Sequence, residues 1–198
     1  QKTPEYIRGR CYESAFKIYN PAVHNREPYT QGRGLRRSPF WQREQELGGY
    51  FMELAGWERA HGYAANEHLL EKYADQVPVR ENEWDNRHFW RVSNAEHLEM
   101  SEGAGMINLS HFAVYDVSGN DAETLMEYAC VAKVGGTTAV GKGIYTHFLD
   151  QEGGVRADLT VLRLAEDSFR IVDGADAGNR DCVWLQRMAQ DRNWSVFI

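Results

Sequence analysis

The 198-residue sequence is poor in features that define several protein classes. It has three cysteines, Cys11, Cys130 and Cys182, which lie far apart without CxxC spacing. This usage disfavours a disulfide framework or a zinc site and predicts reduced thiols in a cytosolic or matrix-like compartment. No apolar run approaches the ~18 residues needed to span a membrane. Basic residues are outnumbered by acidic ones, 22 to 29, and the net charge of -7 argues against a nucleic-acid partner.

Familiar catalytic and cofactor signatures are missing as well. The chain contains no GxGxxG after a strand, no GxxxxGK[ST], no HExxH and no GxSxG. Its seven histidines are scattered, so no metal site is expected. His147 falls in a predicted strand, where packing or surface exposure is a simpler explanation than catalysis. Arg33, Arg36 and Arg37 could hold a phosphate or a carboxylate, but a solvated or inter-domain ion-pair role explains them at least as well.

What is present is a globular composition, with 42% hydrophobic, 26% charged and 12% aromatic residues. Residues 1–80 are irregular, with a short helix expected at 40–48, a strand at 50–54 and a helix near 64–74; a linker is expected at 75–92. A capping box, Ser93-x-x-Glu96, then predicts a helix that ends at glycines 103 and 105. The pattern continues with a strand at 113–117, a helix from 120, three strands at 143–149, 157–164 and 168–173, a helix near 178–191 and a strand at 194–198. The first of these helices has an apolar face made of Ala122, Leu125, Met126, Ala129 and Cys130. The second is expected to point Val183, Trp184, Leu185 and Met188 inward. This order predicts an α+β fold.

A single carboxylate stands at the start of the second strand in the stretch DQEGGVRADLTVLRL, residues 150–164. Alternation along this strand does not determine the face on which Asp158 lies. A carboxylate beside a Gly-Gly turn, at the start of a central strand, is suited to act as an acid, a base or a hydrogen-bond acceptor. A surface aspartate at a strand entry is the simpler interpretation, so the pattern alone leaves the role of Asp158 open.

Several segments, read together, resemble one known family. The joining segment of dimethylglycine and sarcosine dehydrogenases and oxidases is similar to GRGLRRSPFWQREQELGGYFMELAGWERAHGY. The folate-binding aminomethyltransferase domain of these enzymes, related to the glycine-cleavage T-protein, resembles EGAGMINLSHFAVYDVSGNDAE, GKGIYTHFLDQEGGVRADLTVLRL and FRIVDGA. The resemblance covers residues 30–198. It implies a joining segment of the FAD-oxidoreductase part at 1–80 and, at 81–198, the first half of a folate-binding domain with a mixed or antiparallel sheet and packed helices.

The resemblance implies an oxidoreductase with two sites. A flavin domain, absent from this chain, would oxidise an N-methyl amine with FAD. The folate domain would pass the one-carbon unit to tetrahydrofolate as 5,10-methylenetetrahydrofolate. The implied catalytic residue is Asp158, beside the reactive folate nitrogen, and Tyr145 and the backbone of Val172, Asp173 and Gly174 would flank the pterin. The family commonly has N-A or G-A where this chain has VDGADAG.

The implied partners are a small N-methyl amine, the flavin domain and the second half of the folate domain, in the same or another chain; a homo-oligomer is left open. The implied location is cytoplasmic, with the mitochondrial matrix as the alternative. Because the chain starts at Gln1 and ends in an apolar stretch, we expect a piece of a longer polypeptide. Trp57 and Glu58 are expected to hold the flavin and folate modules together. Two further functions stay open: a scaffold or regulatory subunit without catalysis, and a flavin-free, folate-dependent demethylase.

Overall fold

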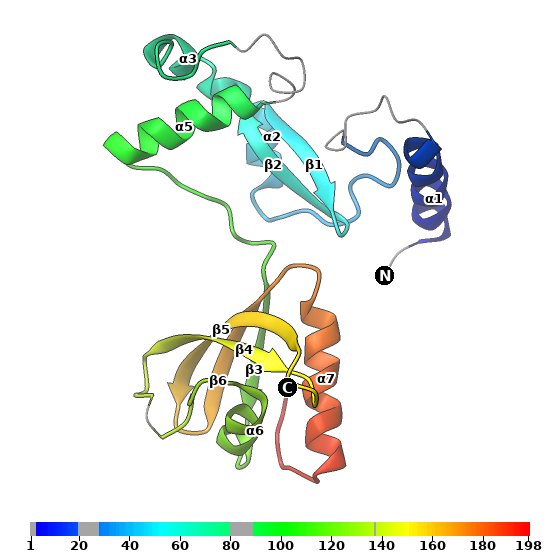
Figure 1. Cartoon of the computed structure of the whole chain (residues 1–198), viewed down its shortest axis with the longest axis vertical. Coiled ribbons are helices and arrows are strands. Elements are labelled where there is room, and N and C mark those ends of the chain that lie inside the picture. The colour runs from blue at the N-terminus through cyan, green and yellow to red at the C-terminus, as the bar shows by residue number, and fades with distance from the viewer. Residues whose placement is uncertain (1–2, 20–27, 80–88, 137) are drawn as a thin grey trace. The chain divides into compact units, whose positions relative to one another are not determined.

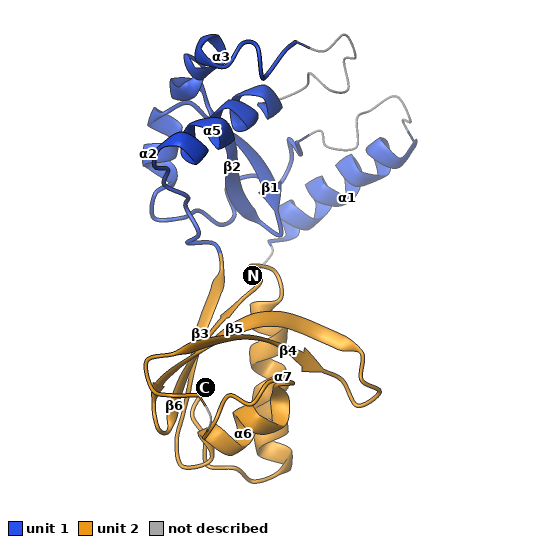
Figure 2. Cartoon of the chain, turned by 60° about the vertical axis from the view of Figure 1, so that its left-hand side comes forward, with its two compact units in different colours: residues 1–111 blue, residues 112–198 orange. Residues whose placement is uncertain are grey.

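The chain forms two compact units, residues 1–111 and 112–198, in a computed structural model that describes residues 3–19, 28–79, 89–136 and 138–198 (Figure 1). Each unit contains its own antiparallel sheet (Figure 2). Within the described ranges, every helix is too short or too polar to cross a membrane. The sequence predicts a domain boundary at residue 80, whereas the compact units separate after His111; the role of each domain stays a prediction.

Unit 1 combines a β-hairpin with helices. Its elements are α1 (Pro4–Tyr19), α2 (Trp41–Glu46), β1 (Gly49–Leu54), β2 (Trp57–Tyr63), the 3-10 turn η1 (Ala64–Asn66), α3 (Leu69–Lys72) and α5 (Trp90–Glu102). The short helix at 40–48 and the strand at 50–54 are confirmed by α2 and β1. The single helix predicted at 64–74 is divided between η1 and α3. Part of the predicted linker, residues 80–88, lies outside the described residues.

The predicted start of α5 is wrong. The helix begins at Trp90, so Ser93 lies inside it, and its hydroxyl donates a hydrogen bond to the backbone carbonyl of His61 in β2. The serine therefore joins two elements and does not cap a helix. The predicted end is confirmed, because α5 finishes at Glu102 and Gly103 follows it.

Unit 2 is a four-stranded antiparallel sheet with two helices. Its elements are β3 (Ala113–Ser118), α6 (Ala122–Ala129), β4 (Gly143–Leu149), β5 (Val155–Ala165), β6 (Ser168–Asp173) and α7 (Gly178–Asp191), and the strand order is β3-β6-β5-β4. The predicted strands and helices of this region are confirmed, with β5 two residues longer at its start and one at its end. The last predicted strand is wrong, because Phe197 makes only an isolated bridge to Ser118.

The core of unit 2 lies between both helices and one face of the sheet. In β5, Ala157, Leu159 and Val161 are buried, and the residues between them are more exposed. These side chains pack with the predicted apolar face of α6 and with Leu185 of α7. Val183 does not point inward as predicted: it is 44% exposed, because a residue two positions from Leu185 lies on the far side of a helix. Since both helices cover one face, the other face of the sheet is open within the described residues of unit 2; it is called the open face.

Candidate functional site

The open face of the unit 2 sheet brings together three of the predicted site residues. Tyr145 of β4 pairs with Thr160 of β5, and Thr160 pairs with Val172 of β6. Val172 in turn pairs with Val114 of β3. Because residues directly opposite one another in antiparallel strands point to the same face, these four side chains form a row across the sheet. Asp158 lies on this face too, two residues before Thr160.

Asp158 is a surface residue with an oriented carboxylate. Its Oδ2 atom accepts a hydrogen bond of 3.1 Å from the Tyr145 hydroxyl, and both side chains are exposed. This hydrogen bond is the main cause that raises the pKa of Tyr145, so the phenol stays protonated and able to donate at physiological pH. His147 lies opposite Asp158 across the strands, and its ring meets the Tyr145 ring edge-on at 5.3 Å between centroids. The arrangement presents an aromatic surface with a carboxylate at its edge.

Asp173 and Gly174 are placed differently. Asp173 ends β6 on the helix-covered face, and it is 2% exposed. Its carboxylate accepts hydrogen bonds from the Gly174 backbone N–H at 2.7 Å and from the Tyr115 hydroxyl at 3.3 Å. Burial raises the pKa of Asp173, and the nearby Asp181 adds to this rise, which outweighs the two hydrogen bonds. Asp173 and Asp158 therefore lie on opposite faces of the sheet.

A buried charged cluster at the start of α7 has no signal in the sequence. The pairing of β4 with β5 skips Arg156, which forms a β-bulge. Its Nε donates to Asp181 at 3.1 Å, and Arg180 adds contacts of 2.9 and 2.8 Å to the same carboxylate. The Asp181 side chain is 0% exposed, and a buried carboxylate is tolerated only when it is paired in this way. Strict alternation would place Arg156 on the face of Asp158, and the bulge turns it to α7.

The arginine-rich loop of unit 1 pairs within the protein. Glu58, with a side chain that is 4% exposed, accepts hydrogen bonds from Arg33 at 2.9 and 2.5 Å and from the Gly34 N–H at 2.6 Å. Burial would raise the pKa of Glu58, but these hydrogen bonds outweigh it and lower the pKa. The Arg37 guanidinium lies 3.9 Å from the centroid of the Trp41 ring. Arg33 forms an ion pair, but its partner lies in the same unit and not in another domain. A role of Glu58 between modules stays a prediction.

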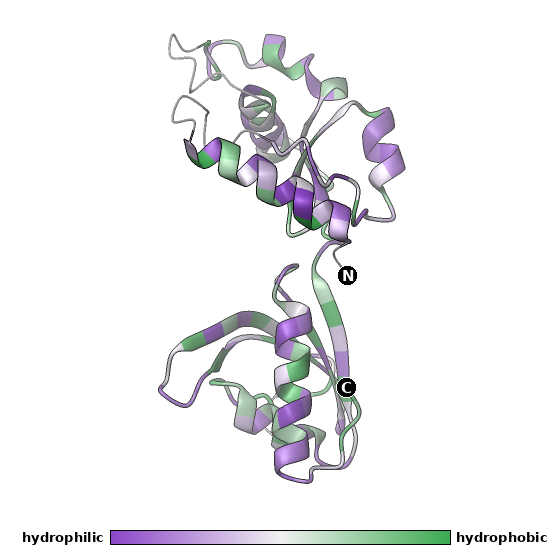
Figure 3. Cartoon of the chain, turned by 90° about the vertical axis from the view of Figure 1, so that its right-hand side faces the viewer, coloured by the Kyte–Doolittle hydropathy of each residue, from purple (hydrophilic) through white to green (hydrophobic). Residues whose placement is uncertain are grey.

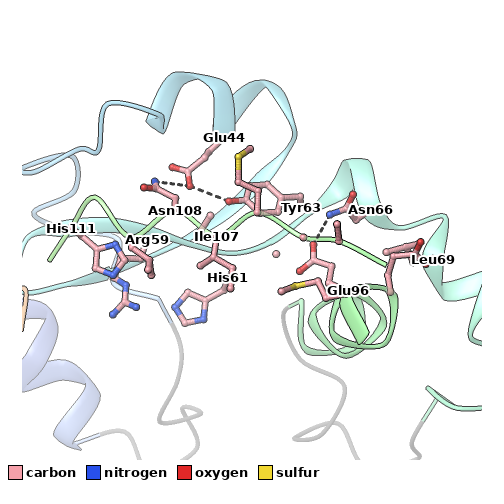
Figure 4. A pocket seen from close by; sticks show the side chains of 18 of the residues that line it. Glu44, Arg59, His61, Tyr63, Asn66, Leu69, Glu96, Ile107, Asn108 and His111 are labelled. Atoms are coloured by element: carbon pink, nitrogen blue, oxygen red, sulfur yellow. Dashed lines mark hydrogen bonds between the residues drawn. The ribbon is translucent and has the colours of Figure 1, made fainter. Parts of the chain in front are cut away.

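A cavity of about 430 Å³ in unit 1 is a second place where polar groups converge (Figure 4). The buried Glu44 carboxylate accepts hydrogen bonds of 3.0 Å from the Tyr63 hydroxyl and the Asn108 side-chain amide. Glu96 accepts one of 2.7 Å from Asn66. The Glu44 contacts link α2 to β2 and to the segment after α5, and the Glu96 contact links α5 to η1. No sequence motif indicates these contacts. Neither here nor elsewhere in the described ranges do three or more His, Cys, Asp or Glu side chains gather as a metal site would require.

Most of the chain matches proteins of one family. The family model of the GCVT N-terminal domain matches residues 40–198. The 4-methylaminobutanoate oxidase (formaldehyde-forming) of Paenarthrobacter nicotinovorans is 29% identical over 197 residues, which are 100% of this chain and 23% of the oxidase. The aminomethyltransferase of Bordetella avium (strain 197N) is 34% identical over 164 residues, which are 83% of this chain and 37% of that enzyme.

A solved structure shows the same fold. The glycine cleavage system aminomethyltransferase T from Bartonella henselae aligns with a TM-score of 0.60 at 21% identity, over 83% of this chain and 37% of that chain. This likeness confirms the predicted aminomethyltransferase-like α+β fold. The chain spans between 23% and 37% of the length of these relatives. Since the family model covers most of the sequence, the chain belongs, as its motifs predict, to the glycine-cleavage T-like family defined by the GCVT N-terminal domain.

Proposed function

We propose that the chain is the folate-binding module of an FAD- and tetrahydrofolate-dependent N-demethylating oxidoreductase of the dimethylglycine or sarcosine type. The observation that carries this proposal is the exposed Tyr145–Asp158 pair on the open sheet face. Relatives named aminomethyltransferase support a one-carbon transfer, and the oxidase that matches the whole chain supports coupling to amine oxidation. FAD would bind in a part of the enzyme outside this chain.

The open sheet face suits a flat heterocycle with N–H groups. Tyr145 and Val114 are 62% and 57% exposed, and the half-buried Val172 lies between them in the same row. Aromatic and branched aliphatic side chains bind the faces of such rings, while a few placed polar groups set their orientation. Asp158 supplies an acceptor at the edge of the row. Tetrahydrofolate would therefore bind here as the one-carbon acceptor.

The reaction proposed for this face moves the carbon of an iminium ion to folate. Its CH₂ group gives up its two bonds to the amine nitrogen and forms one bond to each of two folate nitrogens. The two protons that these nitrogens lose leave with the amine as an ammonium ion, so atoms and charge balance. Asp158 takes a proton from a folate nitrogen and returns it to the departing amine. The Tyr145 hydroxyl orients the Asp158 carboxylate for this transfer.

The name of the oxidase relative supports a second outcome. That protein is named formaldehyde-forming, so release of the one-carbon unit as formaldehyde is a second possible fate here. A scaffold and a flavin-free demethylase differ from the proposed enzyme in simple properties of the full-length protein. A scaffold would form no methylenetetrahydrofolate, and a flavin-free demethylase would show no flavin absorbance.

The test is a comparison of full-length enzyme with its Asp158→Asn variant. Asparagine keeps the size of the side chain but cannot take up a proton, so formation of methylenetetrahydrofolate should fall about 100-fold. Amine oxidation should be unchanged, and free formaldehyde should accumulate. The control is Asp116→Asn on the same sheet face, where the carboxylate pairs with Arg170 at 2.8 and 2.9 Å. Unchanged methylenetetrahydrofolate formation in the Asp158 variant, or an equal loss in the control, contradicts the assignment.

A further inference from the structure

Helix α1 carries most of its large apolar side chains, though not the buried Tyr6, on the side that faces solvent. They are Ile7 (48% exposed), Tyr12 (75%), Phe16 (57%), Ile18 (76%) and Tyr19 (87%), together with the exposed Cys11. At about 100° per residue, these six positions fall within one half of the helix surface. They are called the α1 apolar face below. In Figure 3, where α1 lies in front, its ribbon carries both hydrophobic and hydrophilic residues.

The opposite side of α1 is polar, and it is the side that binds the rest of unit 1. The Tyr6 hydroxyl donates to Glu53 at 3.1 Å, and Arg10 forms an ion pair with the same carboxylate. One turn further on, Glu13 accepts hydrogen bonds of 2.8 and 3.0 Å from the Thr30 N–H. These contacts determine the rotation of the helix about its axis. The α1 apolar face cannot turn towards its own unit unless they break.

The size of the α1 apolar face indicates a partner. An aromatic side chain covers about 150–250 Å², so the exposed surface areas of the side chains in the α1 apolar face add up to on the order of 500 Å². Monomeric soluble proteins rarely expose larger contiguous apolar patches. A partner of equal area would give a total of about 1,000 Å², which is typical of two domains in one chain and small for a stable complex of separate proteins. A covalent tether favours such a contact because it removes much of the entropy lost on association.

Similarity to known proteins favours one occupant. The match to the GCVT N-terminal domain begins at residue 40, so α1 lies outside it. The match to the oxidase covers 197 residues, and therefore includes α1. The match to the Bordetella avium aminomethyltransferase covers only 164 residues. The sequence of α1 is thus part of the match to a much longer oxidase, of which this chain covers 23%.

We propose that the α1 apolar face docks onto the flavin-binding, amine-oxidising part of the same enzyme and holds that part beside the folate-binding module. This inference rests on the proposed function above. The occupant presents an apolar surface, because none of the six members of the face is charged. The exposed Glu5–Arg8 pair, at 3.6 Å, lies in the same half of the helix surface, in the N-terminal part of α1.

Cys11 reports this docking without an activity assay. In native full-length enzyme, iodoacetamide should alkylate Cys11 at least about tenfold more slowly than in the urea-unfolded enzyme, as read by peptide mass spectrometry. Phe16→Glu should restore rapid labelling, because a carboxylate in the α1 apolar face opposes docking. The matched control is Phe40→Glu: Phe40 is 56% exposed in the same unit but outside α1, so Cys11 should stay protected. Rapid labelling of Cys11 in the native wild-type enzyme overturns the proposal.

Photocrosslinking identifies the occupant. With p-benzoylphenylalanine in place of Tyr12, adducts should map to the flavin-binding part of the polypeptide. Adducts to α1 of a second copy, or the absence of adducts in the flavin-binding part, overturn the proposal. Flavin absorbance and methylenetetrahydrofolate formation in the same preparation test the proposed function separately. An active enzyme with unprotected Cys11 refutes only the docking, and a protected Cys11 without folate activity refutes only the one-carbon transfer.

Discussion

The ion pair between the buried Glu58 and the partly exposed Arg33 provides a quantitative test of how the arginine-rich loop is attached to the β-hairpin. The Glu58 carboxylate accepts three hydrogen bonds from two nitrogens of Arg33 and one from the Gly34 N–H. Two backbone hydrogen bonds next to this ion pair also join the loop to the hairpin. The Arg36 N–H donates to the Gly56 carbonyl at 2.8 Å, and the Glu58 N–H donates to the Arg36 carbonyl at 3.0 Å. The perturbation is Glu58→Gln, which keeps the shape of the side chain and removes its charge.

The expected loss of unfolding free energy is about 2 kcal/mol. Removal of one member of a buried ion pair costs about 3–5 kcal/mol, and a hydrogen bond to a charged group contributes about 1.5–3 kcal/mol. Two features reduce the loss here. The Arg33 side chain is 31% exposed and regains water, and the glutamine oxygen still accepts one hydrogen bond.

The loss should depend on pH in a defined direction. Because the pKa of Glu58 is lowered in the folded protein, its stabilisation is fully present above the ordinary glutamate value and is lost as the pH falls through the folded value. The difference in stability between wild type and Glu58→Gln should therefore be constant around neutral pH. It should shrink as the pH falls below about 4.5.

Urea unfolding followed by tryptophan fluorescence measures these differences. A double-mutant cycle with Arg33→Met should give a coupling of about 1.5 kcal/mol. The matched control is Glu46→Gln, whose carboxylate pairs with Arg43 at 3.0 Å with side chains 53% and 68% exposed. This control should change stability by less than about 0.5 kcal/mol. Wild-type stability of Glu58→Gln at neutral pH, or a deficit that persists unchanged in acid, would show that the pair does not hold the loop in this way.

Two further predictions concern single positions. Asp173→Asn should raise the melting temperature by a few degrees at neutral pH, because the raised pKa of Asp173 gives stability that is present in acid and lost as the pH rises through the folded value. Thermal unfolding at several pH values checks this, and a gain that is largest in acid would contradict it. Gly32→Ala should loosen α1, because Gly32 has a φ of +65° and an added Cβ would lie 2.8 Å from the Tyr6 ring. The control is Gly153→Ala: Gly153 has a φ of +83° in open space, so this variant should lose only about 1 kcal/mol of unfolding free energy. Limited proteolysis of α1 compares the two variants, and equal cleavage in both would contradict the role of the contact between position 32 and the Tyr6 ring.

Most of unit 2 could be predicted from the sequence because its elements bury one face each. Alternation marks the buried residues of β5, and the 3.6-residue period marks Leu125 and Met126 in α6. The family motifs are also local, so the fold class and the family follow from the sequence.

Unit 1 was harder to predict because its contacts do not follow the usual pattern. In α1 the polar side is bound by Glu53 and the loop near Thr30, while the apolar side faces solvent. A pattern rule assumes the reverse, and residues 1–80 are expected from sequence to be irregular. In α5, Ser93 has the spacing of a cap but serves as a link to β2.

In unit 2, the order of the elements from β3 to α7 and most of the side chains that they bury therefore follow from the sequence alone. Which of the implied site residues meet depends on contacts between elements. Strand register places Tyr145 beside Asp158 and aligns it with Val172, whereas Asp173 faces the helices and the bulge turns Arg156 towards α7. Alternation belongs to a single strand, while register and bulges depend on hydrogen bonds between strands that are distant in sequence, so only the folded sheet fixes them.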